Sequence, residues 1–165
     1  QLANLTLALA GAAALAKHGA TPALRADAIA AGVEGVVWPG RLQWRDWRGY
    51  RLLLDGAHNR EATAALASAL TAMGLSGRLD LLFSCLDAKP LATMAELLRP
   101  HVRDVLLAPI DSPRASSVER LAAAFPGGHP FPSIPAALAA LRADRPTLVT
   151  GSLRLVGEVM AHTAR

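Results

Sequence analysis

An acid, an imidazole and an amide stand close together after a short apolar run. Residues 52–59 read LLLDGAHN, so that Asp55, His58 and Asn59 follow a predicted strand. A carboxylate there can accept hydrogen bonds from ribose hydroxyls or hold a metal-bound water. His58 and Asn59 stand where the next helix begins and can present donors to a phosphate, together with free backbone N–H groups. An equally supported interpretation is that Asp55 and Asn59 only cap the turn and the helix.

Three further polar segments follow predicted strands, at residues 87–89, 111–114 and 151–152. In a parallel α/β sheet, ligands bind beyond the carboxyl ends of the strands, so these segments are also candidates for a site. Each has an ordinary structural explanation as well. Lys89 can simply decorate a helix start, and Ser152 is a good N-cap by itself.

Apolar periodicity and helix-breaking residues define the elements that must position these groups. Continuous apolar strands alternate with helices, which is typical of strands buried on both faces. The prediction is therefore a doubly wound, Rossmann-like α/β fold with a mostly parallel sheet and helices on both faces. Helices are expected at residues 2–18, 22–31, 60–73, 91–99, 117–125, 134–142 and 153–162, and strands at 42–46, 50–55, 79–85, 105–109 and 147–150.

The break Trp38-Pro39-Gly40-Arg41 predicts a domain boundary. It separates a helical segment, residues 1–40, from an α/β domain, residues 41–165. The chain opens with Gln1 inside a helical pattern and without an N-cap, so we expect it to be a fragment.

Composition narrows the function classes. The 165 residues are 52% apolar with a net charge of +4, which suits an anionic ligand, although the charge is spread along the chain. No Lys/Arg run is interleaved with aromatic residues, so no nucleic-acid partner is expected. The apolar stretch at residues 5–16 is too short to span a bilayer, so no membrane anchor is expected. The single cysteine, Cys85, fits a reducing cytoplasm, and no histidine has metal-ligand spacing, so no metal site is expected.

Two motifs resemble a known family. WPGRLQ at 38–43 and LDGAHN at 54–59 resemble the paired WPGR and DGAHN signatures of the folylpolyglutamate synthase/dihydrofolate synthase family, within the Mur ligase superfamily. QLAN at 1–4 looks like the end of that family's central ATPase domain. TGSL at 150–153 and SPRA at 112–115 resemble its TGS and GPRG segments. The likeness covers the whole chain. It implies that this chain is the carboxyl-terminal portion of an enzyme of that family.

The resemblance implies an ATP-dependent ligase of folate biosynthesis and one-carbon metabolism. Such an enzyme phosphorylates a carboxylate of dihydropteroate or folate, and L-glutamate attacks the acyl phosphate. ATP and Mg²⁺ are the implied cofactors, and a cytoplasmic monomer is expected. Whether dihydropteroate, folate or both are acceptors stays open.

The resemblance also implies a role for individual residues. Asn4, Arg41 and Asp55 match positions that bind ATP, on the adenine, phosphate and ribose or metal sides respectively. His58 and Ser152 match catalytic positions, His58 being linked to ATP handling and domain closure. The carboxylates of glutamate would be bound by Lys89, Arg114 and Ser152. We expect Arg41, Asp55 and His58 to converge at the carboxyl ends of the strands, with Lys89 and Ser152 opposite.

The sequence departs from the family pattern at several points. Arg60 replaces a proline, residues 88–90 keep the lysine of a DKD-like segment but neither acid, and Arg154 stands where tyrosine is common. No Gly-x-x-x-x-Gly-Lys-Ser/Thr occurs in the chain, so the phosphate cradle and the metal ligands are missing. We therefore expect this segment alone to be inactive.

Other classes of function are less well supported by the residues. A free-standing Rossmann-like nucleotide-binding module lacks a Gly-x-Gly-x-x-Gly after any strand. A phosphatase with Asp55 as nucleophile lacks a second acid, because Ala57 stands in its place. A purely structural α/β domain predicts no ATP-dependent change.

Overall fold

The computed structural model describes residues 2–164 and divides between Trp38 and Pro39 into two compact units. The first unit holds two helices, α1 (Leu2–Lys17) and α2 (Ala26–Glu34). Gly19 has a φ of 71° and follows the end of α1, as a helix stop requires. The predicted bounds of the second helix were wrong. Arg25 is extended and pairs with Asp27, so the helix begins at Ala26 rather than Pro22 and continues through Gly32.

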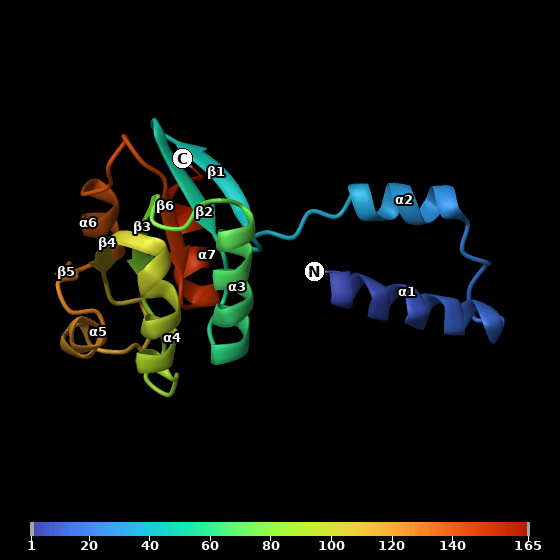
Figure 1. Cartoon of the computed structure of the whole chain (residues 1–165), viewed down its shortest axis with the longest axis horizontal. Coiled ribbons are helices and arrows are strands. Elements are labelled where there is room, and N and C mark those ends of the chain that lie inside the picture. Colours follow the sequence, from blue (N-terminus) through green and yellow to red (C-terminus); the bar gives the residue numbers. More distant parts are fainter. Residues whose placement is uncertain (1, 165) are drawn as a thin grey trace. The chain divides into compact units, whose positions relative to one another are not determined.

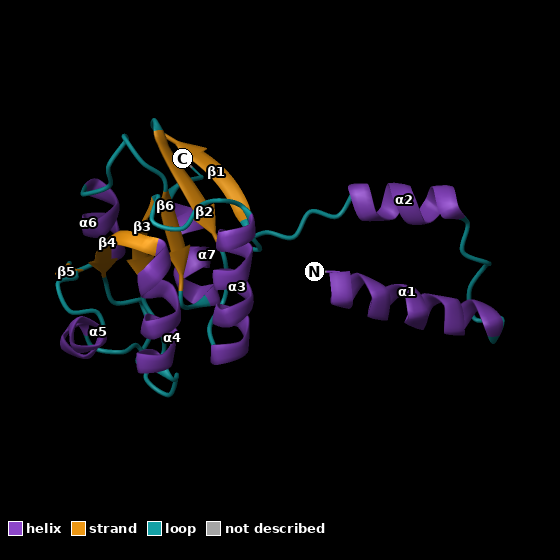
Figure 2. Cartoon of the chain, in the orientation of Figure 1, coloured by secondary structure: helices purple, strands orange, loops and turns teal. Residues whose placement is uncertain are grey.

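The second unit is a six-stranded sheet with helices on both sides (Figures 1 and 2). The order of the strands is β1-β2-β6-β3-β4-β5, and only the β1–β2 pair is antiparallel. The mostly parallel α/β fold is confirmed. The strands are β1 (Gln43–Trp47), β2 (Tyr50–Leu54), β3 (Leu79–Phe83), β4 (Val102–Leu107), β5 (His129–Pro130) and β6 (Thr147–Thr150). The helices are α3 (Arg60–Ala72), α4 (Leu91–Leu98), the 3₁₀ turn η1 (Arg99–His101), α5 (Val118–Ala124), α6 (Ile134–Ala139) and α7 (Leu153–His162).

Two apolar cores lie on opposite faces of this sheet. Leu53 points into the core that α3, α4 and α5 cover, while its neighbours Leu52 and Leu54 point into the core that α6 and α7 cover. Successive side chains of a strand alternate between faces, so continuous leucine runs place apolar groups in both cores. Each fully buried leucine contributes roughly 1.5–3 kcal/mol to folding. The sheet is thus a rigid support for the loops at its edges.

The strand order determines which loops meet. β6 is the last strand in the chain but lies between β2 and β3, and it is parallel to both. The carboxyl ends of these three strands therefore share one edge of the sheet. The loops that leave them contain the DGAHN motif, the segment from Ser84 to Lys89, and Gly151 with Ser152.

Candidate functional site

A pocket of about 250 Å³ lies at this edge of the sheet. It brings together three residues that the sequence singled out: His58 after β2, Lys89 after β3 and Ser152 after β6. The complete lining is His58, Leu86, Lys89, Gly151, Ser152, Leu153 and Arg154. The pocket is therefore assembled from three strand ends that are far apart in the sequence.

Asp55 comes three residues before the pocket residue His58 but does not itself line the pocket. Its side chain is buried, with 7% of its surface exposed. Oδ2 accepts a hydrogen bond from the N–H of Leu42 at 3.0 Å, and Oδ1 accepts one from the N–H of Ala57 at 2.9 Å. Burial raises the pKa of Asp55, while these N–H groups and the charge of Arg41 act in the opposite direction. Both carboxylate oxygens thus accept hydrogen bonds from backbone N–H groups of the two motifs.

The turn at Gly40 folds against the DGAHN motif. The N–H of Gly56 donates to the carbonyl of Gly40 at 2.8 Å, and the N–H of Gly40 donates to Oε1 of Gln43 at 2.9 Å. Gly40 has a φ of 70°, and a Cβ there would lie 2.8 Å from Cγ1 of Val156. Glycine is thus required on two grounds, the backbone angle and the close approach of α7. Arg41, held by this turn, is exposed and its charge acts on Asp55.

His58 is held by its own loop. Nδ1 lies 2.9 Å from the carbonyl oxygen of Gly56 and must donate to it, because a carbonyl can only accept. In the neutral ring Nε2 is then unprotonated. The half-buried imidazole lines the pocket. The neighbouring Asn59 has a structural role, since its Oδ1 accepts from the N–H of Ala62 at 2.8 Å and caps α3. The capping interpretation is therefore confirmed for this residue.

The segment after β6 closely approaches the end of β3. Gly151 has a φ of 110°, and a Cβ there would lie 2.4 Å from the carbonyl oxygen of Ser84. Its N–H donates to the carbonyl of Ala57 at 3.0 Å, which links β6 to the DGAHN loop. Ser152 is buried and caps α7, with Oγ accepting from the N–H of Arg154 at 3.1 Å. Gly151 therefore lets three strand ends approach closely.

Two predicted residues lie away from the pocket. Arg114 is exposed in the loop after β4, where its carbonyl accepts from the N–H of Asp87 at 2.9 Å, and it does not line the pocket. Asn4 is exposed on α1 in the first unit. The sequence pattern did not indicate Leu86 or Arg154 as lining residues. Arg154 could have been found from its place in the first turn of the helix that Ser152 caps.

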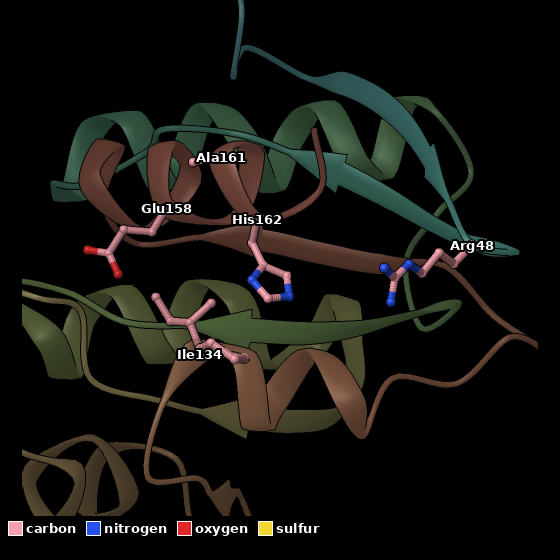
Figure 3. A pocket seen from close by; sticks show the side chains of 6 residues that line it. Arg48, Ile134, Glu158, Ala161 and His162 are labelled. Atoms are coloured by element: carbon pink, nitrogen blue, oxygen red, sulfur yellow. The ribbon is translucent and has the colours of Figure 1, made fainter. Parts of the chain in front are cut away.

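A second hollow, of about 560 Å³, lies between α6 and α7, on the face of the sheet that these two helices cover (Figure 3). None of the residues predicted for the site lines it. His162, near the end of α7, points across it toward Ile134, as expected for a helix-end residue (Figure 3). Its lining is Arg48, Ile134, Pro135, Glu158, Ala161 and His162.

The described residues give no support to a metal site or a membrane span. Within residues 2–164, no three His, Cys, Asp or Glu side chains are grouped closely enough to hold a metal ion. No helix in that range is both long enough and apolar enough to cross a bilayer.

A match to a known protein family identifies the domain that contains this pocket. Residues 40–153, which include the DGAHN motif and every strand, match the family described as "Mur ligase, glutamate ligase domain". The chain belongs to this family. The matched range begins at Gly40, the residue whose turn is held by the DGAHN loop.

Individual relatives of this Mur ligase domain point to folate enzymes. The chain is 31% identical to the dihydrofolate synthase/folylpolyglutamate synthase of Escherichia coli K12 over 138 residues, 81% of this chain and 32% of that protein. It is 36% identical to the Mycobacterium tuberculosis protein of the same name over 124 residues, 75% of this chain and 25% of that protein. The chain thus spans about a third or less of the length of these curated relatives.

Solved structures show the same likeness. The E. coli enzyme in complex with DHPP and ADP has a TM-score of 0.79 at 28% identity, covering 91% of this chain and 37% of that one. A bifunctional folylpolyglutamate synthase/dihydrofolate synthase with Mn, AMPPNP and L-glutamate bound has a TM-score of 0.80 at 27% identity, covering 96% of this chain and 40% of that one. The chain resembles the carboxyl-terminal portion of such enzymes.

Proposed function

We propose that this chain is the carboxyl-terminal part of an ATP-dependent ligase that adds L-glutamate to dihydropteroate, to a folate, or to both. The observation that carries the proposal is the pocket that joins His58, Lys89 and Ser152 in a Mur ligase glutamate ligase domain. Relatives whose structures hold ADP, DHPP or L-glutamate support the same substrates.

The domain assignment is part of this proposal. Residues 1–40 would belong to a central ATPase domain, and residues 41–165 would form the glutamate-ligase domain. The division between Trp38 and Pro39 and the family match from Gly40 support a boundary near this point. The helices of the first unit carry exposed apolar side chains, among them Leu7 and Leu15, as expected for helices that belong to a larger core.

The residues of the pocket suit an amino acid with anionic groups. Lys89 lines the pocket, and within the described residues its ammonium group has no hydrogen bond or ion pair. It can therefore hold a carboxylate of glutamate. The Nε2 lone pair of His58 is suited to accept a proton as the glutamate amine becomes nucleophilic. Ser152 orders the start of α7 beside them.

Arg41 is proposed to face the phosphates of ATP, which supply the activated acyl phosphate. Asp55 would act by holding the turn that presents Arg41, since both of its oxygens already accept backbone N–H groups. Mg²⁺ is proposed as the metal cofactor of the complete enzyme, with its ligands mostly outside this chain, since residues 2–164 contain no group of three His, Cys, Asp or Glu side chains that could hold a metal ion. A monomer in the cytoplasm is proposed for the complete enzyme, together with Asn4 on the adenine side and Arg114 as an outer carboxylate contact.

The test is ATP-dependent incorporation of labelled L-glutamate by the complete protein that contains this chain, with dihydropteroate and tetrahydrofolate as separate acceptors. Lys89→Ala should raise the KM for glutamate roughly tenfold or more, because a charge-assisted hydrogen bond contributes about 1.5–3 kcal/mol. Arg41→Ala should raise the KM for ATP or lower kcat. The matched control is Arg78→Ala, which removes an exposed cation at the opposite end of β3.

Two outcomes would count against the proposal. Nucleotide binding without glutamate incorporation for either acceptor would favour a nucleotide-binding module without ligase activity. A Lys89→Ala enzyme with the kinetics of the Arg78→Ala control would remove Lys89 from the glutamate site.

A further inference from the structure

We propose that Arg154 is a second carboxylate-binding cation of the pocket and that it selects amino acids with two carboxylates over those with one. The inference rests on the proposed ligase function and adds a residue that determines specificity. It follows from where α7 places the guanidinium and from what holds it there.

Arg154 lies in the first turn of α7, and its N–H donates to Oγ of Ser152, the residue that caps the helix after β6. Arg154 lines the same 250 Å³ pocket as Lys89, which follows the end of β3. Two basic residues, which follow neighbouring strands, thus line one small pocket. The first turn of a helix is also the end at which the backbone favours anions.

Glu158 orients the guanidinium of Arg154. The Nε of Arg154 lies 3.4 Å from Oε1 of Glu158, one turn further along α7. That same carboxylate oxygen accepts a hydrogen bond from the N–H of Asp111 at 3.0 Å, so Glu158 is tied to the loop after β4. Glu158 is the more buried partner, with 29% of its side chain exposed against 54% for Arg154. It therefore acts as a positioning residue for the guanidinium.

The Nη groups of Arg154 remain available to a ligand. Glu158 faces Nε, and within residues 2–164 no hydrogen bond reaches the two Nη groups of Arg154. A guanidinium held at one nitrogen can still bind a carboxylate through its other N–H groups, often in a bidentate manner. The ammonium of Lys89 can hold a different carboxylate as a point charge. A small pocket with two cations at separate strand ends fits an amino acid that has a carboxylate at each end.

This arrangement makes a kinetic prediction for the complete ligase. Replacing Arg154 with glutamine should raise the KM for L-glutamate by roughly 10- to 100-fold, the loss expected for a charge-assisted hydrogen bond, with a smaller change in kcat. The preference for L-glutamate over L-glutamine, measured as the ratio of their kcat/KM values, should fall by a similar factor. Arg154→Lys should retain part of the preference, because it keeps the charge but loses the planar donor array.

Variants of the surrounding residues separate a specific role from a merely structural one. Glu158→Gln should shift the KM for glutamate in the same direction by a smaller factor, since it loosens Arg154 without removing it. The matched control is Arg142→Gln, which breaks a similar exposed ion pair, with Asp144, at the amino end of β6. That variant should have the KM and the glutamate preference of the unaltered enzyme.

Each outcome bears on one of the two proposals. If the unaltered enzyme incorporates glutamate but Arg154→Gln keeps both its KM and its preference over glutamine, the role of Arg154 is wrong and the ligase function stands. An equal fall in kcat/KM for both amino acids would also overturn the role in selection. If the unaltered enzyme incorporates no glutamate, the proposed function fails first and the role of Arg154 fails with it.

Discussion

The carboxylate of Asp55 accepts a hydrogen bond from the backbone N–H of Leu42, 3.0 Å away and thirteen positions earlier in the chain. This bond joins the turn of the WPGR motif to the DGAHN motif. Leu42 has a φ of 45°, a left-handed conformation that is costly for a leucine. A buried acceptor that satisfies its N–H helps to maintain that conformation, and so fixes the residues on either side of it. Asp55 therefore positions Arg41, whatever it also contacts in the complete enzyme.

Asp55→Asn should destabilise the α/β unit by about 1–3 kcal/mol at neutral pH. The amide has one accepting oxygen, so either Leu42 or Ala57 would face an NH₂ group instead of an acceptor. Urea denaturation of the 165-residue chain measures the change. Asp46→Asn, an exposed substitution on β1, is the control and should change stability by less than about 0.5 kcal/mol. Equal effects of the two substitutions would contradict the role of Asp55.

The stability difference between the unaltered chain and Asp55→Asn should depend on pH. Burial raises the pKa of Asp55 above its ordinary value of 3.8. At a pH between the ordinary and the raised pKa, the folded chain therefore keeps a proton that the unfolded chain has released. The contribution of Asp55 is then largest at acidic pH and falls as the pH rises from that ordinary value through the raised one. Denaturation at a series of pH values from about 4 to 7 tests the sign. A difference that grows with pH would show that the pKa is lowered in the fold.

Gly151→Ala should destabilise the α/β unit by more than about 2 kcal/mol, since overpacking and an unfavourable φ act together. The new Cβ would lie 2.4 Å from the carbonyl oxygen of Ser84 and 2.6 Å from Cε2 of Phe83, at a φ of 110°. Gly157→Ala is the matched control, because nothing lies within 4 Å of a Cβ there and the residue is inside α7. It should stabilise the unit by roughly 0.5–1 kcal/mol. Thermal denaturation of both variants checks the opposite signs.

Much of the fold could be predicted because local sequence patterns indicate where the strands and helices lie. The leucine run that ends at Leu54 and the Asn59 cap mark a strand and the next helix without any knowledge of their neighbours. The insertion of β6 between β2 and β3 could not be predicted, because it depends on long-range pairing. The two-residue strand β5 at His129 could not be distinguished from an irregular segment, since it is too short to show alternation.

The candidate site shows the same division. Motif residues placed His58, Lys89 and Ser152 at strand ends, and the structure brings these three into one pocket. The sequence could not show that both oxygens of Asp55 would be occupied by the backbone, because the partner Leu42 is reached only through the fold. In the sequence, Arg154 is only a departure from a family pattern. Its place in the pocket depends on how α7 packs after β6.

The 165-residue chain by itself should not turn over ATP, whatever nucleotide it binds. Phosphoryl transfer needs a phosphate cradle and a metal ion held in place, and these residues include no Gly-x-x-x-x-Gly-Lys-Ser/Thr sequence. Residues 2–164 also contain no cluster of metal ligands. Release of phosphate by the purified chain, measured with and without Mg²⁺, should equal that of a buffer blank, and the Asp55→Ala variant should be indistinguishable from it. Turnover that Asp55→Ala abolishes would show that this chain carries a complete catalytic site. The proposed ligase function would then have to give Asp55 a direct catalytic role.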